Sequence, residues 1–156
     1  EVVMTIEITL DRTQTFEQVN KITSYIGSKT KSDQDMMSYA VIATTSYNDE
    51  LLQNYYDDAL NSLVTIFKPF LSTTTIEDAR TTFTLEMPSN FAAALLNSLQ
   101  KEVDSFAVDF ILSLWLTLCG VPAEMYAKKA AASLEAISVK LYTRMAPQYD
   151  APEQQP

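Results

Sequence analysis

The chain has 156 residues, and its composition already restricts the chemistry that it can perform. It carries 11 Lys and Arg against 20 Asp and Glu, so its formal net charge is −9, and it contains no histidine. Without an imidazole, Ser-His-Asp catalysis, Cys-His catalysis and histidine-dependent metal sites are excluded within this chain. Its two glycines, Gly27 and Gly120, are too far apart to build a glycine-rich phosphate loop.

Charge and apolar content narrow the remaining classes of protein. A pI near 4.4 with scattered basic residues argues against a protein that wraps nucleic acid. The single cysteine, Cys119, permits no internal disulfide and favours a reducing compartment. The most apolar run, 106–119, is shorter than the ~20 residues that cross a bilayer, and the first residues lack the pattern of a signal peptide. We therefore expect no membrane segment.

The first predicted elements are a strand over 3–10 and a helix over 14–26. In the strand, apolar residues occupy every second position, which is the period of a sheet with one buried face. The helix has one apolar stripe, and Thr15 is its expected N-cap, with Gln18 three residues later completing a capping box. Gly27 is the expected C-terminal stop, because glycine tolerates positive φ.

A loop, an ambiguous segment and a second helix follow. Residues 28–35 are polar throughout and predict an exposed loop. Residues 36–47 fit either a short strand or part of an ordered loop, and periodicity does not decide between them. A helix with a broad apolar face then begins at Asn48 or Asp49, where acidic residues suit the helix dipole, and Pro69 ends its regular part.

The second half of the chain predicts a strand and two more helices. After a linker at 72–75, residues 79–87 alternate like the first strand, so we expect the two to pair antiparallel. A third helix begins at 88–90 and could run to Cys119, roughly 45 Å at 1.5 Å per residue. Its second half is apolar on nearly all sides, so we expect it at the centre of the fold or against another chain.

A fourth helix is expected from Pro122 to Arg144, and the proline suits a first helical position. The last segment, 146–156, holds three prolines and three glutamines and predicts an extended or disordered arm. The expected fold is α+β and mainly α, with about four helices, the third long and apolar, packed with a small two-stranded antiparallel sheet. The expected domain covers 1–145.

Six residues are candidates for an assembly interface: Tyr55, Tyr56, Asp109, Trp115, Tyr142 and Tyr149. Large amphipathic rings are enriched at interfaces, although such rings also fill cores. Asp109 interrupts the apolar run of the third helix, which fits an intersubunit partner, a buried polar hinge or the solvated side of that helix. No spacing of acidic residues predicts a metal site, and no catalytic residue or cofactor is predicted.

The order of elements resembles a family of viral proteins. The helix that begins at 48–55, the apolar helix 106–119 and the closing helix that ends at 140–144 are similar to head–tail connector or adaptor (neck) proteins of tailed bacteriophages. The stretches 67–71 and 85–88 also look like prophage structural proteins. The N-terminal strand and helix depart from this pattern, because an adaptor core does not require them.

The resemblance implies a virion protein of the neck or tail, assembled in the host cytoplasm, without catalysis or cofactor. It implies a homo-oligomeric ring that contacts portal and tail proteins, with DNA passing an acidic lumen that repels its phosphates. The alternative is an acidic protein-binding module of the inhibitor or DNA-mimic type, unrelated to virions. A third class, an enzyme using converging carboxylates, is not predicted by any spacing in the chain.

Overall fold

The structure is a computed structural model, and it describes residues 3–30 and 42–147. Its elements, in chain order, are β1 (Val3–Asp11), α1 (Arg12–Thr30), the 3₁₀-helix η1 (Ser46–Asn48), α3 (Asp49–Phe67), β2 (Leu71–Glu77), β3 (Arg80–Pro88), the 3₁₀-helix η2 (Ala93–Leu95), α4 (Leu96–Leu118) and α5 (Glu124–Tyr142). This confirms a mainly helical α+β fold with a small antiparallel sheet. The predictions for 31–41, for Tyr149 and for the arm from 148 lie outside the described residues.

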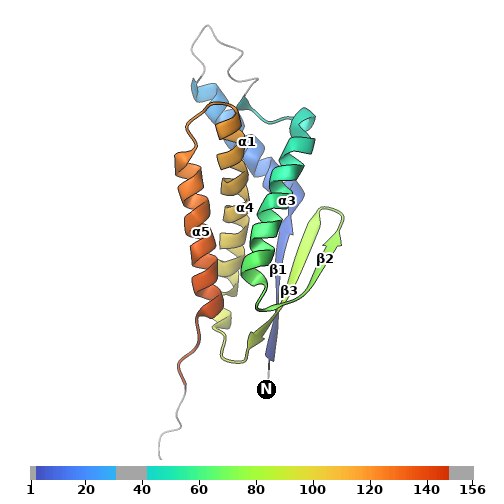
Figure 1. The fold of residues 1–156 in the computed structure, drawn as a ribbon, viewed down its shortest axis with the longest axis vertical. Coiled ribbons are helices and arrows are strands. Elements are labelled where there is room, and N and C mark those ends of the chain that lie inside the picture. Colours follow the sequence, from blue (N-terminus) through green and yellow to red (C-terminus); the bar gives the residue numbers. More distant parts are fainter. Residues whose placement is uncertain (1–2, 31–41, 148–156) are drawn as a thin grey trace, which may run out of the picture.

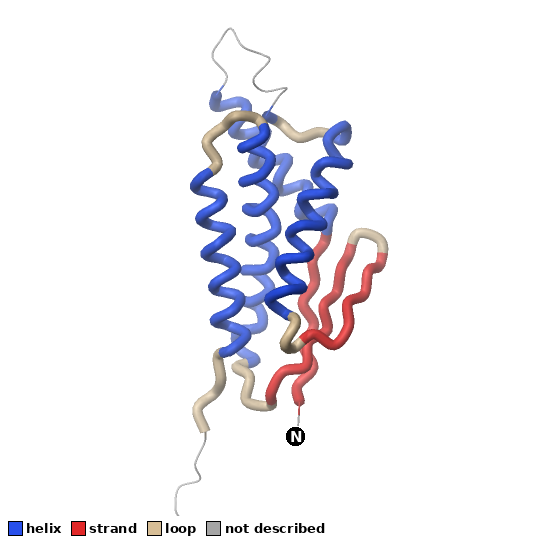
Figure 2. Tube along the Cα trace, in the orientation of Figure 1, coloured by secondary structure: helices blue, strands red, loops and turns tan. Residues whose placement is uncertain are grey.

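The helices form a layer against one face of the sheet. Helices α3, α4 and α5 run up and down beside one another, and β1 continues into α1 so that the pair lies end to end along α4 (Figure 1). The strands gather at the lower right in Figure 2, where the hairpin of β2 and β3 projects beyond the helices. No described helix is long and apolar enough to cross a membrane.

The sheet has three strands in the order β1-β3-β2, all antiparallel. The predicted pairing of the first strand with 79–87 is confirmed, with a register from Val3 opposite Pro88 to Asp11 opposite Arg80. The expectation of two strands is wrong, because the whole of the presumed linker 72–75 lies in β2. Both faces of β2 are largely exposed, so its sequence lacks the alternation that one buried face imposes.

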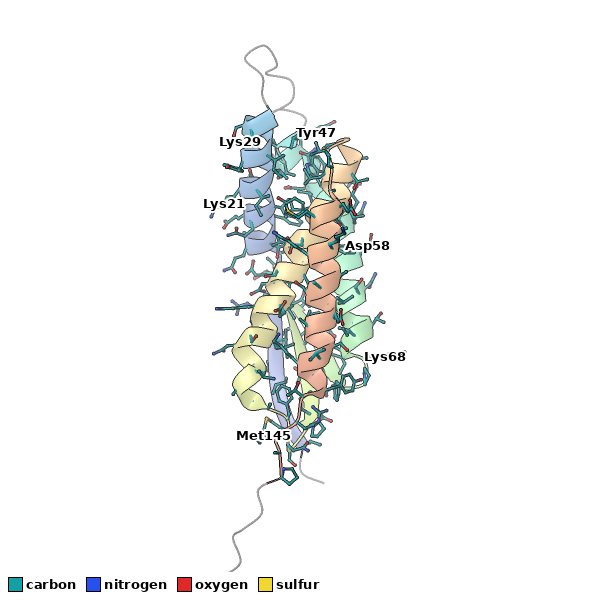
Figure 3. The ribbon with its side chains drawn as sticks, turned by 90° about the vertical axis from the view of Figure 1, so that its left-hand side faces the viewer. Lys21, Lys29, Tyr47, Asp58, Lys68 and Met145 are labelled. Atoms are coloured by element: carbon teal, nitrogen blue, oxygen red, sulfur yellow. The ribbon has the colours of Figure 1, made fainter. Side chains whose placement is uncertain are left out.

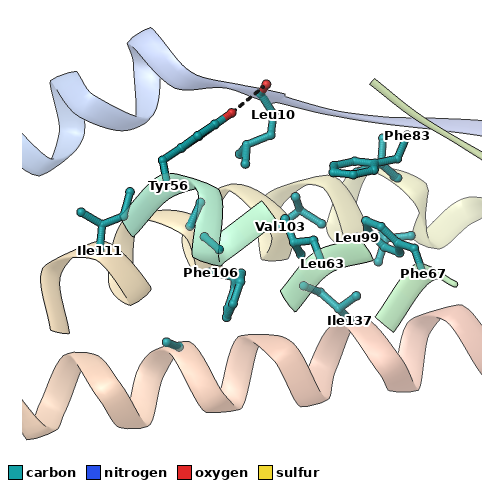
Figure 4. Packing of buried hydrophobic residues seen from close by; sticks show 14 of the residues in the cluster. Leu10, Tyr56, Leu63, Phe67, Phe83, Leu99, Val103, Phe106, Ile111 and Ile137 are labelled. Atoms are coloured by element: carbon teal, nitrogen blue, oxygen red, sulfur yellow. Dashed lines mark hydrogen bonds between the residues drawn. The ribbon is translucent and has the colours of Figure 1, made fainter. Parts of the chain in front are cut away.

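The core lies between the apolar face of the sheet and the helices. Figure 4 shows side chains of β1, β3, α3, α4 and α5 converging there. Phe67 of α3 lies against Phe83 of β3 with ring centroids 5.2 Å apart, and Phe16 of α1 meets Tyr56 of α3 edge to face at 5.9 Å. Aromatic pairs at these distances add directional attraction to the burial of their apolar surface.

The start of α1 differs from the sequence prediction. The helix begins at Arg12, directly after β1, and the Gln14 amide donates to Asp11 Oδ1 at 3.0 Å, so Asp11 is the cap. Thr15 lies inside the first turn, where its hydroxyl donates to the Asp11 carbonyl at 2.8 Å. Gly27 does not stop the helix, which continues to Thr30. The direct join of strand to helix moves the cap four residues upstream.

The other helix boundaries also shift. The α4 helix begins at Leu96 instead of 88–90, because β3 extends to Pro88 and Phe91 then forms a bridge with Arg144. The described residues do not enclose the second half of α4 on all sides. Phe110 is half-buried there, and Leu118 is 60% exposed. The described part of the ambiguous segment, 42–47, contains no strand.

The cap of α1 gives a test of the strand-to-helix junction. Replacing Asp11→Ala removes the acceptor for the Gln14 amide, and we expect a loss of about 1 kcal/mol in the free energy of unfolding. Asp11→Asn keeps an acceptor oxygen and should stay within a few tenths of the wild-type value. Urea unfolding of the three proteins measures this. Equal losses in both variants would contradict the capping role.

Candidate assembly surface

Two of the predicted interface residues lie inside the core. Tyr56 is 3% exposed and its hydroxyl donates to the Leu10 carbonyl at 3.4 Å, so it links α3 to the end of β1. Trp115 is 4% exposed, and its indole N–H donates to the Ile42 carbonyl at 2.7 Å. Their polar atoms are used within the chain, so neither ring presents a surface to a second molecule.

The remaining aromatic candidates differ in exposure. Tyr55 is half-buried against the core. Tyr142, at the end of α5, is 55% exposed, and its ring centroid lies 5.3 Å from that of Phe70. The Arg144 guanidinium sits 5.9 Å from the same Phe70 ring. Tyr142 is therefore the described aromatic candidate that offers substantial surface.

Asp109 lies in a shallow groove between α4 and α5, which Lys101, Glu102 and Lys129 also line. Burial raises the pKa of its carboxyl, and the nearby Lys129 opposes this effect. Lys140 Nζ pairs with Glu102 Oε1 at 3.5 Å in the same region. Asp109 is thus half-buried beside α5, between the predicted extremes of a core hinge and a solvated position. In the described ranges, no group of three or more potential ligands could hold a metal ion.

Sequence reasoning missed a polar contact that closes one edge of the sheet. The Gln100 amide nitrogen donates to the Thr9 carbonyl at 2.6 Å, and its oxygen accepts the Thr9 N–H at 3.0 Å. The side chain from α4 thereby replaces a neighbouring strand at this point of β1. Pairing of this kind joins residues 91 positions apart, and no local pattern in the sequence signals it.

At the opposite edge of the sheet, along β2, no residue within 3–30 or 42–147 provides such a cover. Every residue of β2 after Leu71 is exposed, and 71–76 carry no charge. In an antiparallel ladder the main-chain groups of successive residues alternate between the two sides. Since Glu86 donates to the Phe70 carbonyl and Thr75 lies opposite Thr82, Thr74 and Ile76 direct their N–H and C=O groups outward.

The outer face of the sheet is covered by short polar side chains, and no described helix packs on it (Figure 1). The register aligns threonines from all three strands on this face: Thr5, Thr9, Thr73, Thr75, Thr82 and Thr84. Glu7, Asp11, Glu77 and Glu86 lie on the same face, together with one basic residue, Arg80. The face is therefore acidic in balance.

Two neighbouring helices, α1 and α3, differ in the charge of their exposed residues. The α3 helix has four acidic residues and no basic one, and Asp49, Glu50, Asp57 and Asp58 are all exposed. The α1 helix exposes Lys21 and Lys29 around Tyr25, which is 62% exposed and lies under the Lys29 ammonium at 5.5 Å. Figure 3 shows Lys21 and Lys29 on one side of the molecule and Asp58 on the other, all in its upper half.

The candidate site is a set of three surfaces: the β2 edge, the lysine face of α1 and the acidic face of α3. Of the predicted residues, the structure brings Trp115 and Tyr56 into the core and leaves Tyr142 at the surface. Comparison with family models, with characterised proteins and with solved structures found no match to this chain.

Trp115 tests the link between α4 and the segment at Ile42. In Trp115→Phe, the buried Ile42 carbonyl loses its donor, and we expect unfolding to become easier by about 1–3 kcal/mol. The exposed variant Tyr142→Phe should stay within about 0.5 kcal/mol of wild type. Circular dichroism in a denaturant series measures both, because Trp115 is the sole tryptophan and its fluorescence is lost. A neutral Trp115→Phe would contradict the anchoring role.

Asp109 tests the electrostatics of the α4–α5 groove. Burial raises the pKa of its carboxyl above 3.8, so the folded protein holds this proton more tightly than the unfolded chain. Its contribution to stability is present at low pH and is lost as pH rises through the folded pKa. Asp109→Asn should therefore raise the free energy of unfolding at pH 7 by at most ~0.5 kcal/mol, because solvent screens a half-exposed carboxyl, and the gain should vanish near pH 3.

The Lys129 side chain supplies the control for this experiment. Lys129 favours the ionised carboxylate, so Asp109→Asn should stabilise more in a Lys129→Ala background than in the wild type. Thermal unfolding between pH 3 and pH 7 measures the difference. If Asp109→Asn destabilises at pH 7, attraction to Lys129 outweighs the effect of burial.

Proposed function

We propose that this chain is a virion structural protein: the subunit of a head–tail connector (neck) ring that lies between portal and tail. In this proposal it performs no catalysis and needs no cofactor. It contacts copies of itself, the portal and the tail proteins, and DNA passes without specific binding. The observation that supports a ring is the pair of oppositely charged helix faces on α1 and α3.

A ring needs two different surfaces that fit each other, because a head-to-tail contact repeats from copy to copy until it closes. The acidic pairs of α3, at 49–50 and 57–58, are eight residues apart, and so are Lys21 and Lys29 of α1. At 1.5 Å per residue, both spacings correspond to about 12 Å. The lysines of one copy therefore match the acidic pairs of the next in spacing as well as in sign.

The position of these two faces along the long axis of the molecule favours a closed ring. Lys21, Lys29 and Asp58 lie in the same half along the long axis (Figure 3). Copies arranged around an axis parallel to that direction would bring the faces together with little axial offset. A small offset favours a closed ring over an open helix. The exposed Tyr25 lies between the two lysines, and tyrosine side chains are enriched at protein–protein interfaces.

The outer face of the sheet fits the proposed passage of DNA. Its threonines and three glutamates offer hydroxyl groups and negative charge. Like charge repels phosphates, so a lumen lined by this face would let DNA slide. The net charge of −9 acts in the same direction over longer distances.

Charge reversal tests the ring contact. Lys21→Glu with Lys29→Glu, or Asp57→Lys with Asp58→Lys, places like charges opposite each other, and each pair should weaken assembly at least about tenfold. Combining all four changes restores opposite signs and should recover assembly. Sedimentation velocity across a concentration series measures the effect, with Lys128→Glu on α5 as the matched control. A strict monomer, alone and with portal protein, or no recovery in the fourfold variant, would contradict the proposal.

The virion assignment has its own test. Mass spectrometry of purified phage particles should detect the chain, and its gene should lie beside portal, capsid and terminase genes. Absence from particles and from such a neighbourhood would overturn the assignment while leaving the charge-matched contact intact.

The alternative function, an acidic protein-binding module, is favoured by the same α3 face. A helix with four exposed acidic residues and no basic one can dock on a basic partner, and such a complex weakens steeply as salt screens its charges. In that case Asp57→Lys with Asp58→Lys abolishes partner binding, and the reversed lysines of α1 do not restore it. The rescue experiment therefore separates the two functions.

A further inference from the structure

We propose that β2 is a self-pairing edge: two copies of the chain join β2 to β2 antiparallel, about a two-fold axis at Thr75. The two three-stranded sheets then become one sheet of six strands. This contact is separate from the charged helix faces, and it does not depend on the virion assignment. It concerns main-chain N–H and C=O groups of β2 for which the described part of the chain provides no partner.

The first support is that β2 is an unprotected edge. An exposed strand edge offers unpaired N–H and C=O groups, and proteins usually blunt it with charge, proline, a bulge or a covering side chain. The other edge of this sheet follows that rule, because Gln100 binds both main-chain groups of Thr9. From Thr73 to Ile76, β2 has neither charge nor proline, and its one irregularity lies upstream, between Leu71 and Thr73.

The second support is the shape of the molecule around β2. The β2 strand lies at the outer edge of the sheet, and the hairpin that it forms with β3 stands away from the helices (Figures 1 and 2). At the tip, Asp78 adopts φ 52°, in the left-handed region that tight turns use. A second strand can therefore approach the edge without meeting α3 or α5.

The third support selects a second copy as the occupant. A chain with net charge −9 repels its copies, so self-contact is cheapest where no charge faces charge. With Thr75 opposite Thr75, Thr74 lies opposite Ile76 of the second copy, and Glu77 lies opposite Thr73. No like charges are then directly opposed across the ladder.

The same register gives partners to the outward main-chain groups of β2 and covers part of an exposed side chain. Thr74 and Ile76 direct their N–H and C=O groups outward, and each meets the other in the second copy, for about four hydrogen bonds. Ile76 is 68% exposed in the single chain, and the Thr74 methyl group of the second copy would cover part of it. Only the regular part of β2, from Thr73 to Glu77, takes part.

Cysteine cross-linking tests the register. Across a non-hydrogen-bonded antiparallel pair, the two Cα atoms are ~4.5 Å apart, which suits a disulfide. In a Cys119→Ala background, Thr75→Cys should therefore form a disulfide-linked dimer on mild oxidation at micromolar concentration. Thr73→Cys is the matched control: it lies on the same face and is also exposed, but its own counterpart is four residues away along the strand, ~14 Å.

A reversible measurement completes the test. Ile76→Lys puts a charge at the centre of the edge and should raise the dimer dissociation constant at least tenfold in sedimentation equilibrium, while Ile76→Thr should not. The variants that reverse charge on α1 and α3 should leave the Thr75→Cys cross-link unchanged, which separates this proposal from the ring. Cross-linking of Thr73→Cys as readily as Thr75→Cys, or no Thr75→Cys dimer from folded protein, overturns the proposal.

Discussion

Burial of the apolar side of α4 is the constraint on which the rest of the structure depends. This helix packs against α1, α3, α5 and β1, so it is the common neighbour of the helical layer and the sheet. Eight of its residues are buried, from Leu99 to Leu116. Since hydrophobic burial is the largest favourable term in folding, the positions of the surrounding elements follow from how each covers part of this helix. The surfaces left over are those available for assembly.

The sequence predicts the elements that have one buried face, because burial imposes a period. The alternation in β1 and β3 and the stripe of α3 arise this way, and the structure confirms these elements. It does not predict β2, whose two faces both meet solvent, so that its threonines follow no alternation. An alternating pattern of polarity reflects contact with the core. A strand that is held only by main-chain hydrogen bonds has little such contact, so its sequence shows little alternation.

Errors at element ends have a different origin. Asp11 and Thr15 are both good caps, and local chemistry does not distinguish them. The choice depends on where β1 ends, which the pairing with β3 determines through contacts distant in sequence. Gly27 is similar: glycine permits a stop but does not require one, and the helix continues past it. These decisions are tertiary, so a single sequence does not contain them locally.

The residues of the candidate site were only partly predictable. Composition excludes imidazole chemistry because the chain has no histidine, and the sequence then directs attention to surfaces. Which rings reach those surfaces depends on the packing around α4, which buries Trp115 and Tyr56 and leaves Tyr142 exposed. The open edge and its closed counterpart at Gln100 become visible only when the strand order is known.

The direct passage from β1 into α1 has a mechanical consequence. The N-terminal end of β1 and the C-terminal end of α5 both lie at the lower end of the molecule (Figure 1). Tension applied at these two points meets different resistance. A pull on the N-terminal side loads the β1–β3 pairing in shear, so that the hydrogen bonds along the nine residues of β1 carry the force at the same time. A pull on the C-terminal side reaches the Met145–Asn90 bond and the Phe91–Arg144 bridge in turn. Under tension, the contacts on the C-terminal side would break one after another. The strand β1 and the helix α1 on the N-terminal side would stay folded together.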